Sequence, residues 1–201
     1  MRRMSQRLLI GLAVLGVMAG CASSPSARFY ALNTLAAAPQ AVQRGDLAIA
    51  LGPIDLPTYL DRPQIVTRSG GNRLSVDEFN RWGGLLEEEI GRLMADYLGR
   101  RLGTERIYSY PSRVAPETRY RVAIDIRRLD GGLGGEVVLD AAWSLIDERS
   151  GAVVKTRQQS YRETVATPDY DAYVAGLSSL IGRLAEDIAA ALTASAGPVP
   201  R

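Results

Sequence analysis

Histidine is absent from this 201-residue sequence, and cysteine occurs only once, at Cys21. The lack of histidine excludes Ser–His and Cys–His nucleophilic systems as well as histidine metal sites. A single cysteine excludes a disulfide within the chain, so packing alone must stabilise the core. Large aromatic residues are also scarce, with two phenylalanines and two tryptophans. We therefore expect no enzyme, no catalytic residues and no metal or other cofactor.

Three weaker signals of chemistry have simpler explanations. The glycine run at residues 131–135 lacks the GK[ST] ending of a phosphate loop and precedes a strand pattern, so we predict a hairpin loop. The adjacent carboxylates at residues 87–89 and 186–187 lie in helical patterns and are interpreted as solvated faces. Asp125 and Asp140 lie in neighbouring predicted strands, where we treat them as outward-facing residues.

Charge is nearly balanced, with 24 basic and 22 acidic residues. Without Arg2, Arg3 and Arg7, which lie in a predicted leader, the formal net charge becomes −1. The arginines are scattered along the chain and form no basic cluster in the sequence. Nucleic-acid binding requires a concentrated basic face, so we expect no nucleic-acid partner.

The first 20 residues have the pattern of a signal peptide. Basic residues precede an apolar stretch at residues 8–17, which is too short to cross about 30 Å of hydrocarbon as a helix. The next residues, Met18-Ala19-Gly20-Cys21, form a lipobox. We predict that Cys21 becomes the first mature residue and carries a diacylglycerol and an N-acyl chain. The alternative is an ordinary secretory signal with a coincidental cysteine.

A lipidated Cys21 fixes where the folded part of the chain can lie. More than one acyl chain gives stable membrane attachment. Residue 22 is alanine and not aspartate, which by the sorting rule of bacterial lipoproteins favours the outer membrane, on its periplasmic face. Residues 21–27 then form a lipidated tether, whose six residues after the cysteine reach roughly 20 Å at most. The domain is expected close to the bilayer.

The clearest helix pattern covers residues 85–102. Acidic residues occupy its first turns, Arg100 and Arg101 its last, and Gly103 is placed to act as a left-handed cap. A capping-box pattern at residues 75–78 offers an earlier start, but it would put two glycines inside the helix at about 1 kcal/mol each. We therefore predict a strand to about residue 79, a turn at 82–84 and a helix from about 85. The apolar stripe comprises Leu86, Ile90, Leu93, Met94, Tyr97, Leu98 and Leu102.

Strand patterns precede and follow this helix. We expect strands at residues 28–32, 47–56, 64–68, 73–76 and 106–110, a loop at 33–45, and a bend at Gly52-Pro53. The segments 64–68 and 73–76 should form a hairpin. A strand–helix–strand order favours a crossover, so residues 106–110 should run parallel to residues 47–52.

The last part of the chain reads as three antiparallel strands and a second helix. The strands begin at residues 120, 136 and 152, and Asp169 is placed to cap the helix. The helix stripe comprises Tyr173, Leu177, Leu180, Leu184, Ile188 and Ala191. We predict an α/β (α+β) domain at residues 28–193, with a mixed, largely antiparallel sheet and two long helices on one face. Residues 194–201 are expected to be a disordered tail.

Six runs stand out in this sequence: RFYAL at residues 28–32, GPI at 52–54, LP at 56–57, YLDRPQIVTR at 59–68, RW at 81–82 and IYSYP at 107–111. Together they resemble the ABC-type transport auxiliary lipoproteins of the paraquat-inducible protein C (PqiC) type. The resemblance implies a fold similar to the amino-terminal domain of TolB. It also implies a role in an MCE-type intermembrane lipid transport system that supports membrane integrity. The implied partners are an MCE-domain protein of the PqiB type and its inner-membrane components.

The candidate partner-binding residues are Tyr59, Arg62, Arg81 and Trp82. Trp82 stands before two glycines, and its ring either caps the long helix within the domain or forms a hot spot for a partner or a second copy. The run at residues 60–63 is either a turn that sets the register of the next strand or a contact loop.

Two functions fit these expectations. In the first, the chain is a lipid-anchored docking component of a transport assembly, acting as a single copy or as a homo-oligomer. In the second, it binds phospholipid itself in a groove between helix and sheet, which requires a cavity of roughly 300–1,000 Å³.

Overall fold

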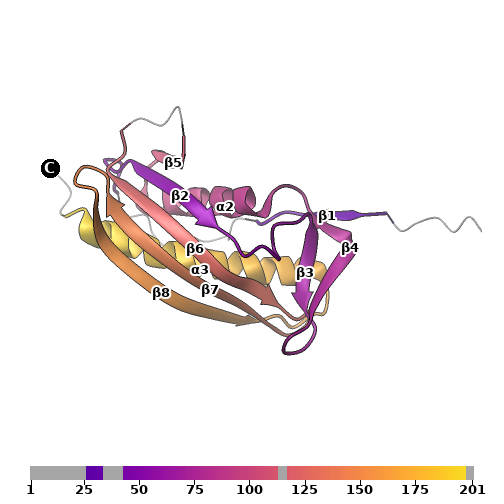
Figure 1. The fold of residues 1–201 in the computed structure, drawn as a ribbon. Coiled ribbons are helices and arrows are strands. Elements are labelled where there is room, and N and C mark those ends of the chain that lie inside the picture. The colour runs from indigo at the N-terminus through magenta and orange to yellow at the C-terminus, as the bar shows by residue number, and fades with distance from the viewer. Residues whose placement is uncertain (1–25, 34–42, 113–116, 198–201) are drawn as a thin grey trace, which may run out of the picture.

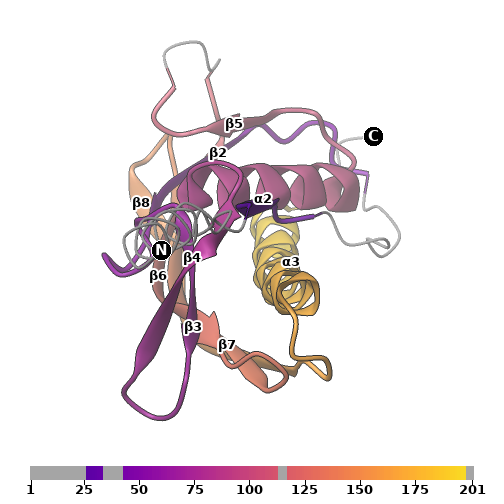
Figure 2. The ribbon, with the colours of Figure 1, turned by 90° about the vertical axis from the view of Figure 1, so that its right-hand side faces the viewer.

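The computed structural model describes residues 26–33, 43–112 and 117–197, which form two sheets and two helices (Figure 1). The larger sheet has five strands in the order β5-β2-β6-β7-β8, and the smaller sheet has the order β1-β4-β3. The helices α2 and α3 both lie on one side of the larger sheet (Figure 2). The predicted α+β class, with mixed strand directions and two helices on one face, is confirmed. The expectation of a single sheet was wrong, because β1, β3 and β4 separate from the rest.

In the larger sheet, β2 (Ile49–Asp55) runs parallel to both of its neighbours, β5 (Ile107–Ser109) and β6 (Tyr120–Gly131). The predicted parallel pairing of β2 with the strand after the first helix is therefore confirmed. The register between β2 and β6 shifts between Leu51 and Ile54, at the predicted bend. Gly52 has φ 125° there, and a Cβ atom would lie 2.6 Å from the carbonyl oxygen of Tyr110, so the bend requires glycine.

The strands β6, β7 (Glu136–Asp147) and β8 (Ala152–Thr164) form the predicted antiparallel meander. The glycine run does form a hairpin loop, although its first residue, Gly131, still belongs to β6. Across β6 and β7, Asp125 opposes Ala142, whereas Asp140 opposes Arg128. The two aspartates therefore do not form a cross-strand pair.

The helix α2 (Leu86–Leu102) begins and ends as the sequence predicts. Leu85 has extended backbone at the N-cap, and Gly103 closes the helix with φ 64°. All seven residues of the predicted apolar stripe are buried. The preceding strand β4 (Leu74–Trp82) continues three residues beyond the predicted end, so the turn begins at Gly83 and not at Trp82.

The helix α3 (Tyr170–Ser195) is capped by the Asp169 carboxylate, which accepts a hydrogen bond of 2.7 Å from the backbone N–H of Ala172. Its whole predicted stripe is buried. The helix extends two residues past the predicted end of the domain. The buried Arg44 guanidinium then donates hydrogen bonds to the carbonyl oxygens of Ala196 and Gly197, which fixes this end of the chain.

The smaller sheet joins distant parts of the chain. Its strands β3 (Gln64–Arg68) and β4 form the predicted hairpin, and β1 (Arg28–Tyr30) pairs in parallel with the end of β4. The predicted signal peptide, Cys21, most of the tether, most of the loop at 33–45 and the end of the tail lie outside the described residues. No helix in the described ranges is long and apolar enough to cross a membrane.

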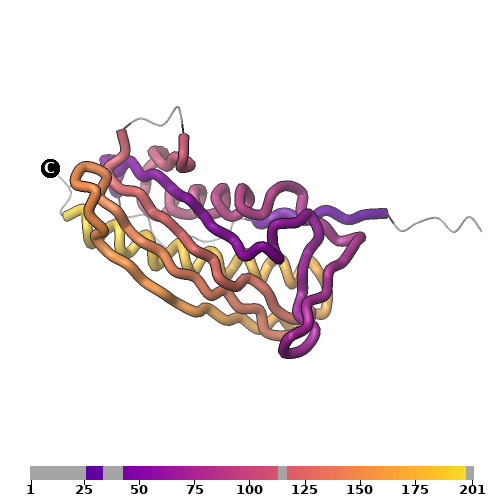
Figure 3. The backbone as a smooth tube through the Cα atoms, in the orientation of Figure 1, coloured from indigo at the N-terminus to yellow at the C-terminus, as the bar shows by residue number. Residues whose placement is uncertain are grey.

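The backbone tube in Figure 3 has two distinct ends. One end holds β1, the end of β4 and the start of α2, and we call it the β1 end. The other end holds the turn between β7 and β8 and the last turns of α3, where the Tyr120 hydroxyl donates to the carbonyl oxygen of Ser195. The predicted lipidation site lies just before β1 in the sequence, so the β1 end is the part of the domain nearest to it along the chain.

Candidate functional site

A groove of about 740 Å³ opens at the β1 end. It runs between the first turn of α2 and the loop that joins β2 to β3, and we call it the α2 groove. Apolar side chains from both sides line much of it. The lining residues are Ile54, Asp55, Leu56, Thr58, Leu60, Asp61, Arg62, Pro63, Trp82, Gly83, Gly84, Leu85, Leu86 and Glu87.

The β2–β3 loop is a compact turn that is fastened at several points. The backbone N–H of Leu60 donates to the carbonyl of Pro57 at 2.9 Å, and the N–H of Trp82 donates to the carbonyl of Pro63 at 2.7 Å. The side chain of Leu60 is buried in the core. The loop therefore holds Asp61 and Arg62 on a fixed base, as expected for the turn considered for residues 60–63, while the contact role of this run stays a prediction.

A buried carboxylate behind the loop fixes it further. Asp130 is fully buried and accepts two hydrogen bonds from Arg68, at 2.7 and 2.8 Å, and one from Arg128 at 2.9 Å. The Tyr59 hydroxyl donates a fourth bond of 2.7 Å. This Asp130 cluster ties the β2–β3 loop and the end of β3 to the end of β6.

The cluster shifts the pKa values of its members. Burial alone would raise the pKa of Asp130, but hydrogen bonds from Arg68, Tyr59 and Arg128 outweigh it and lower that pKa below its ordinary value. Burial, together with the bond to Asp130, raises the pKa of Tyr59 to about 12. Asp130 is therefore a charged structural anchor at neutral pH, and Tyr59 stays protonated as its donor.

Trp82 belongs to the hydrophobic core and is only 5% exposed. Its place in the register is opposite Tyr30 of β1, and what remains of its surface lines the α2 groove. The ring therefore packs within the domain and does not stand out as an exposed hot spot. A substitution at Trp82 removes core packing, so it cannot report on partner binding alone.

The two predicted arginines have different surroundings. Arg62 is exposed and lines the groove. Arg81 is half-buried, donates through Nε to the carbonyl of Glu78 at 2.9 Å and lies opposite Phe29 of β1. The structure thus brings Arg62 and Trp82 together in the groove, with Tyr59 behind it, while Arg81 belongs to the adjacent strand surface.

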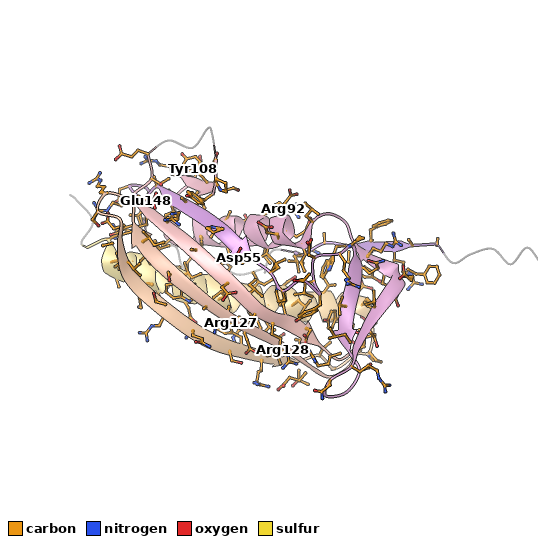
Figure 4. The ribbon with its side chains drawn as sticks, viewed as in Figure 1. Asp55, Arg92, Tyr108, Arg127, Arg128 and Glu148 are labelled. Carbon is orange, nitrogen blue, oxygen red and sulfur yellow. The ribbon has the colours of Figure 1, made fainter. Side chains whose placement is uncertain are left out.

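The groove contains acidic residues that the sequence reasoning did not single out as binding residues. Asp55, Asp61 and Glu87 line the groove together with a single basic residue, Arg62, so the charged lining carries a formal −2. Asp55 stands at the end of β2, as Figure 4 shows. Asp61 was part of the run that carries the family resemblance, whereas nothing in the local sequence connects Asp55 with the start of α2.

Several charged residues elsewhere on the domain form ordinary ion pairs. Arg127 and Glu148, which are both labelled in Figure 4, pair with Asp125 and Arg121 respectively. Within the described ranges, no group of three or more histidine, cysteine, aspartate or glutamate side chains could hold a metal ion. The α2 groove is the candidate site among the described residues, and its apolar and acidic lining suits the binding of a partner segment or ligand.

Solved structures show that this fold occurs in other proteins. One crystal structure, of an uncharacterized protein, has a TM-score of 0.69 at 15% identity and covers 84% of this chain and 99% of its own. The protein XCC0632 from Xanthomonas campestris, of family DUF330, has a TM-score of 0.64 at 16% identity, with 81% and 93% covered. At these identities the likeness establishes the fold alone. A search of curated protein sequences found no significant match.

A family model agrees with the sequence resemblance. The model describes an ABC-type transport auxiliary lipoprotein component, and it matches residues 30–189, from β1 almost to the end of α3. It therefore includes the α2 groove, the Asp130 cluster and both helices. The chain belongs to the family of ABC-type transport auxiliary lipoproteins, and is a lipid-anchored auxiliary component of such a transport system.

Proposed function

We propose that this chain is the outer-membrane docking component of an MCE-type lipid transport system. Cys21 is acylated, residues 22–27 hold the domain near the periplasmic face of the outer membrane, and the α2 groove receives a segment of the MCE-domain partner. The partner, of the PqiB type, is suggested by the resemblance of the sequence. The family description supports the coarser role in ABC-type transport.

The charge of the groove is the observation that carries the proposal. Three carboxylates and one guanidinium stand around an apolar floor. An anionic phospholipid headgroup is repelled by that lining, whereas a protein segment with apolar and basic side chains is complementary to it. The Asp130 cluster and the backbone bonds of the β2–β3 loop hold this surface in place before a partner arrives, which reduces the ordering cost of binding.

Reversing the groove charge tests this proposal. The double variant Asp61→Lys/Glu87→Lys should capture at least tenfold less MCE-domain partner than wild type when the acylated protein is purified from membranes. Both residues are exposed, so the fold should be unaffected. The matched control, Glu105→Lys/Glu148→Lys, changes two exposed acids outside the groove and should capture the partner normally. Equal capture by the two double variants would contradict groove docking.

Direct lipid binding is a second candidate, because the groove volume of about 740 Å³ falls within the range of small-molecule sites. The apolar lining from Leu56, Leu85 and Leu86 suits acyl chains. Lipid extraction and mass spectrometry of the purified protein separate the two functions. A stoichiometric phospholipid, beyond the acyl groups on Cys21, would favour the lipid-binding role.

A further inference from the structure

Exposed apolar side chains are concentrated in the smaller sheet and at the N-cap of α2. Eight large apolar residues of the described chain are exposed, and five of them lie in the smaller sheet or at the N-cap of α2. The two most exposed are Phe29, at 68%, and Leu85, at 63%. Soluble surfaces tolerate single exposed apolar residues, but a cluster marks a contact with a partner or a membrane. The five residues are Phe29, Leu74, Val76, Phe79 and Leu85.

Three of these residues belong to segments that meet at the β1 end. The register of β1 and β4 sets Phe29 opposite Arg81, which is two residues from Phe79 on the same strand. The backbone N–H of Gly83 donates to the carbonyl of Tyr30 at 2.7 Å, so the segment that leads to Leu85 lies against β1. We call Phe29, Phe79 and Leu85 the apolar rim. Figure 2 looks onto this end of the molecule.

The position of the anchor identifies what covers the rim. Only six residues separate Cys21 from Arg28, the first residue of β1, so the seven Cα-to-Cα steps between them span at most about 24 Å. The helix α3 runs from the β1 end to the other end of the domain, and its 26 residues measure about 39 Å. The other end is therefore farther from Cys21 than the rim by about the length of α3. An acylated Cys21 therefore keeps a bilayer within reach of the rim at a high effective concentration.

We propose that the apolar rim inserts into the headgroup region of the bilayer that holds the acyl chains. Phe29, Phe79 and Leu85 enter the interface, and the exposed Arg28 next to Phe29 reaches the lipid phosphates. The inference rests on acylation of Cys21, which is part of the proposed function. Insertion of the rim gives the domain a fixed orientation on the membrane. The lipid anchor and the apolar rim together hold the α2 groove beside the membrane surface, whereas the tether alone would let the domain rotate freely.

Single introduced cysteines test this contact, because the chain contains no cysteine besides Cys21, whose thiol the lipid occupies. The variants are Phe29→Cys, Phe79→Cys and Leu85→Cys, each in the full acylated protein and each labelled with bimane. The matched control is Val153→Cys, since Val153 is 61% exposed and lies at the start of β8, at the opposite end. The proteins are placed in partner-free vesicles of phosphatidylethanolamine and phosphatidylglycerol, with and without a nitroxide-bearing phospholipid.

We expect all four proteins to float with the vesicles, and the nitroxide lipid to quench the rim labels at least twofold while it leaves the Val153→Cys label unchanged. If the proteins float but the rim labels are quenched no more than the control, the membrane contact is overturned, while partner docking stands. Energy transfer between labelled copies, without quenching by the nitroxide lipid, would overturn the membrane contact and would show that a second copy of the chain covers the rim. Failure to float would overturn both the inference and the proposed acylation.

Discussion

Replacing Asp130 by asparagine should destabilise the domain more than any other single charge removal at the groove. Asp130 is fully buried and accepts four hydrogen bonds, three of them from guanidinium groups. Asparagine keeps one acceptor oxygen but loses the charge, and its amide group points N–H donors at other donors. Removing one partner of a buried ion pair typically costs 3–5 kcal/mol. Arg68 and Arg128 keep 24% and 32% exposure, so water compensates in part, and we expect a loss of about 3 kcal/mol.

Urea unfolding followed by tryptophan fluorescence measures this loss, with the free energy of unfolding obtained by linear extrapolation. The control is Asp125→Asn, which removes an exposed pair with Arg127 and should cost less than about 0.5 kcal/mol. Combining Asp130→Asn with Tyr59→Phe should give a coupling energy between roughly 0.5 and 3 kcal/mol, since the two side chains share a hydrogen bond. A loss below about 1 kcal/mol for Asp130→Asn would refute the view that this carboxylate fastens the β2–β3 loop.

Three further predictions concern the core, pH and the anchor. Ile90 and Leu93 are buried under the sheet, so Ile90→Ala and Leu93→Ala should each lower the free energy of unfolding by roughly 2–5 kcal/mol in urea unfolding. A loss of less than about half a kcal/mol at both sites would contradict their place in the core. The pKa of Asp130 is lower in the folded state than in the unfolded chain, where it is about 3.9. The ionised carboxylate therefore stabilises the fold fully above the unfolded pKa, and this stabilisation is lost as the pH falls through the folded-state pKa. In urea titrations, the difference in free energy of unfolding between wild type and Asp130→Asn should thus stay constant from about pH 5 to 8 and decrease below about pH 4. A difference that increased on acidification would contradict the lowered pKa of Asp130. Finally, Cys21→Ser should leave the unprocessed precursor on gels, and maturation at the same site would disprove lipidation there.

The elements that local patterns dictate could be predicted. The stripe of α2 repeats at steps of three and four and ends at Gly103, where a left-handed residue is required. The alternation of buried and exposed residues in β6 and β7 likewise fixes their inner face. These signals depend on a few neighbouring residues, so they survive without knowledge of the fold.

The division into two sheets depends on contacts that no local pattern encodes. The Asp77 carboxylate accepts hydrogen bonds from the backbone N–H groups of Phe79 and Asn80, and the β3–β4 register shifts across this region. The strand therefore continues to Trp82 and pairs with β1, more than 50 residues earlier in the sequence. The burial of Asp130 is equally nonlocal, since Arg68 and Tyr59 come from other elements.

The candidate site was only partly accessible to sequence reasoning. Arg62 and Trp82 were found through the family resemblance, and both line the groove. Asp55 and Glu87 join them because the end of β2 and the first turn of α2 meet in space, which neither segment signals alone. The acidic character of the groove, on which the proposed docking depends, could be recognised only from the fold.

The most direct test of the docking role is the distribution of the MCE-domain partner between membrane fractions. A strain that lacks this chain, and has no redundant copy, is complemented with wild type, with Cys21→Ser or with Asp61→Lys/Glu87→Lys, and the partner is quantified in purified outer membranes. We predict partner association and detergent resistance with wild type, and loss of both with either variant. If the partner remains in the outer-membrane fraction and the detergent barrier holds in the strain that lacks the chain altogether, the docking role is contradicted.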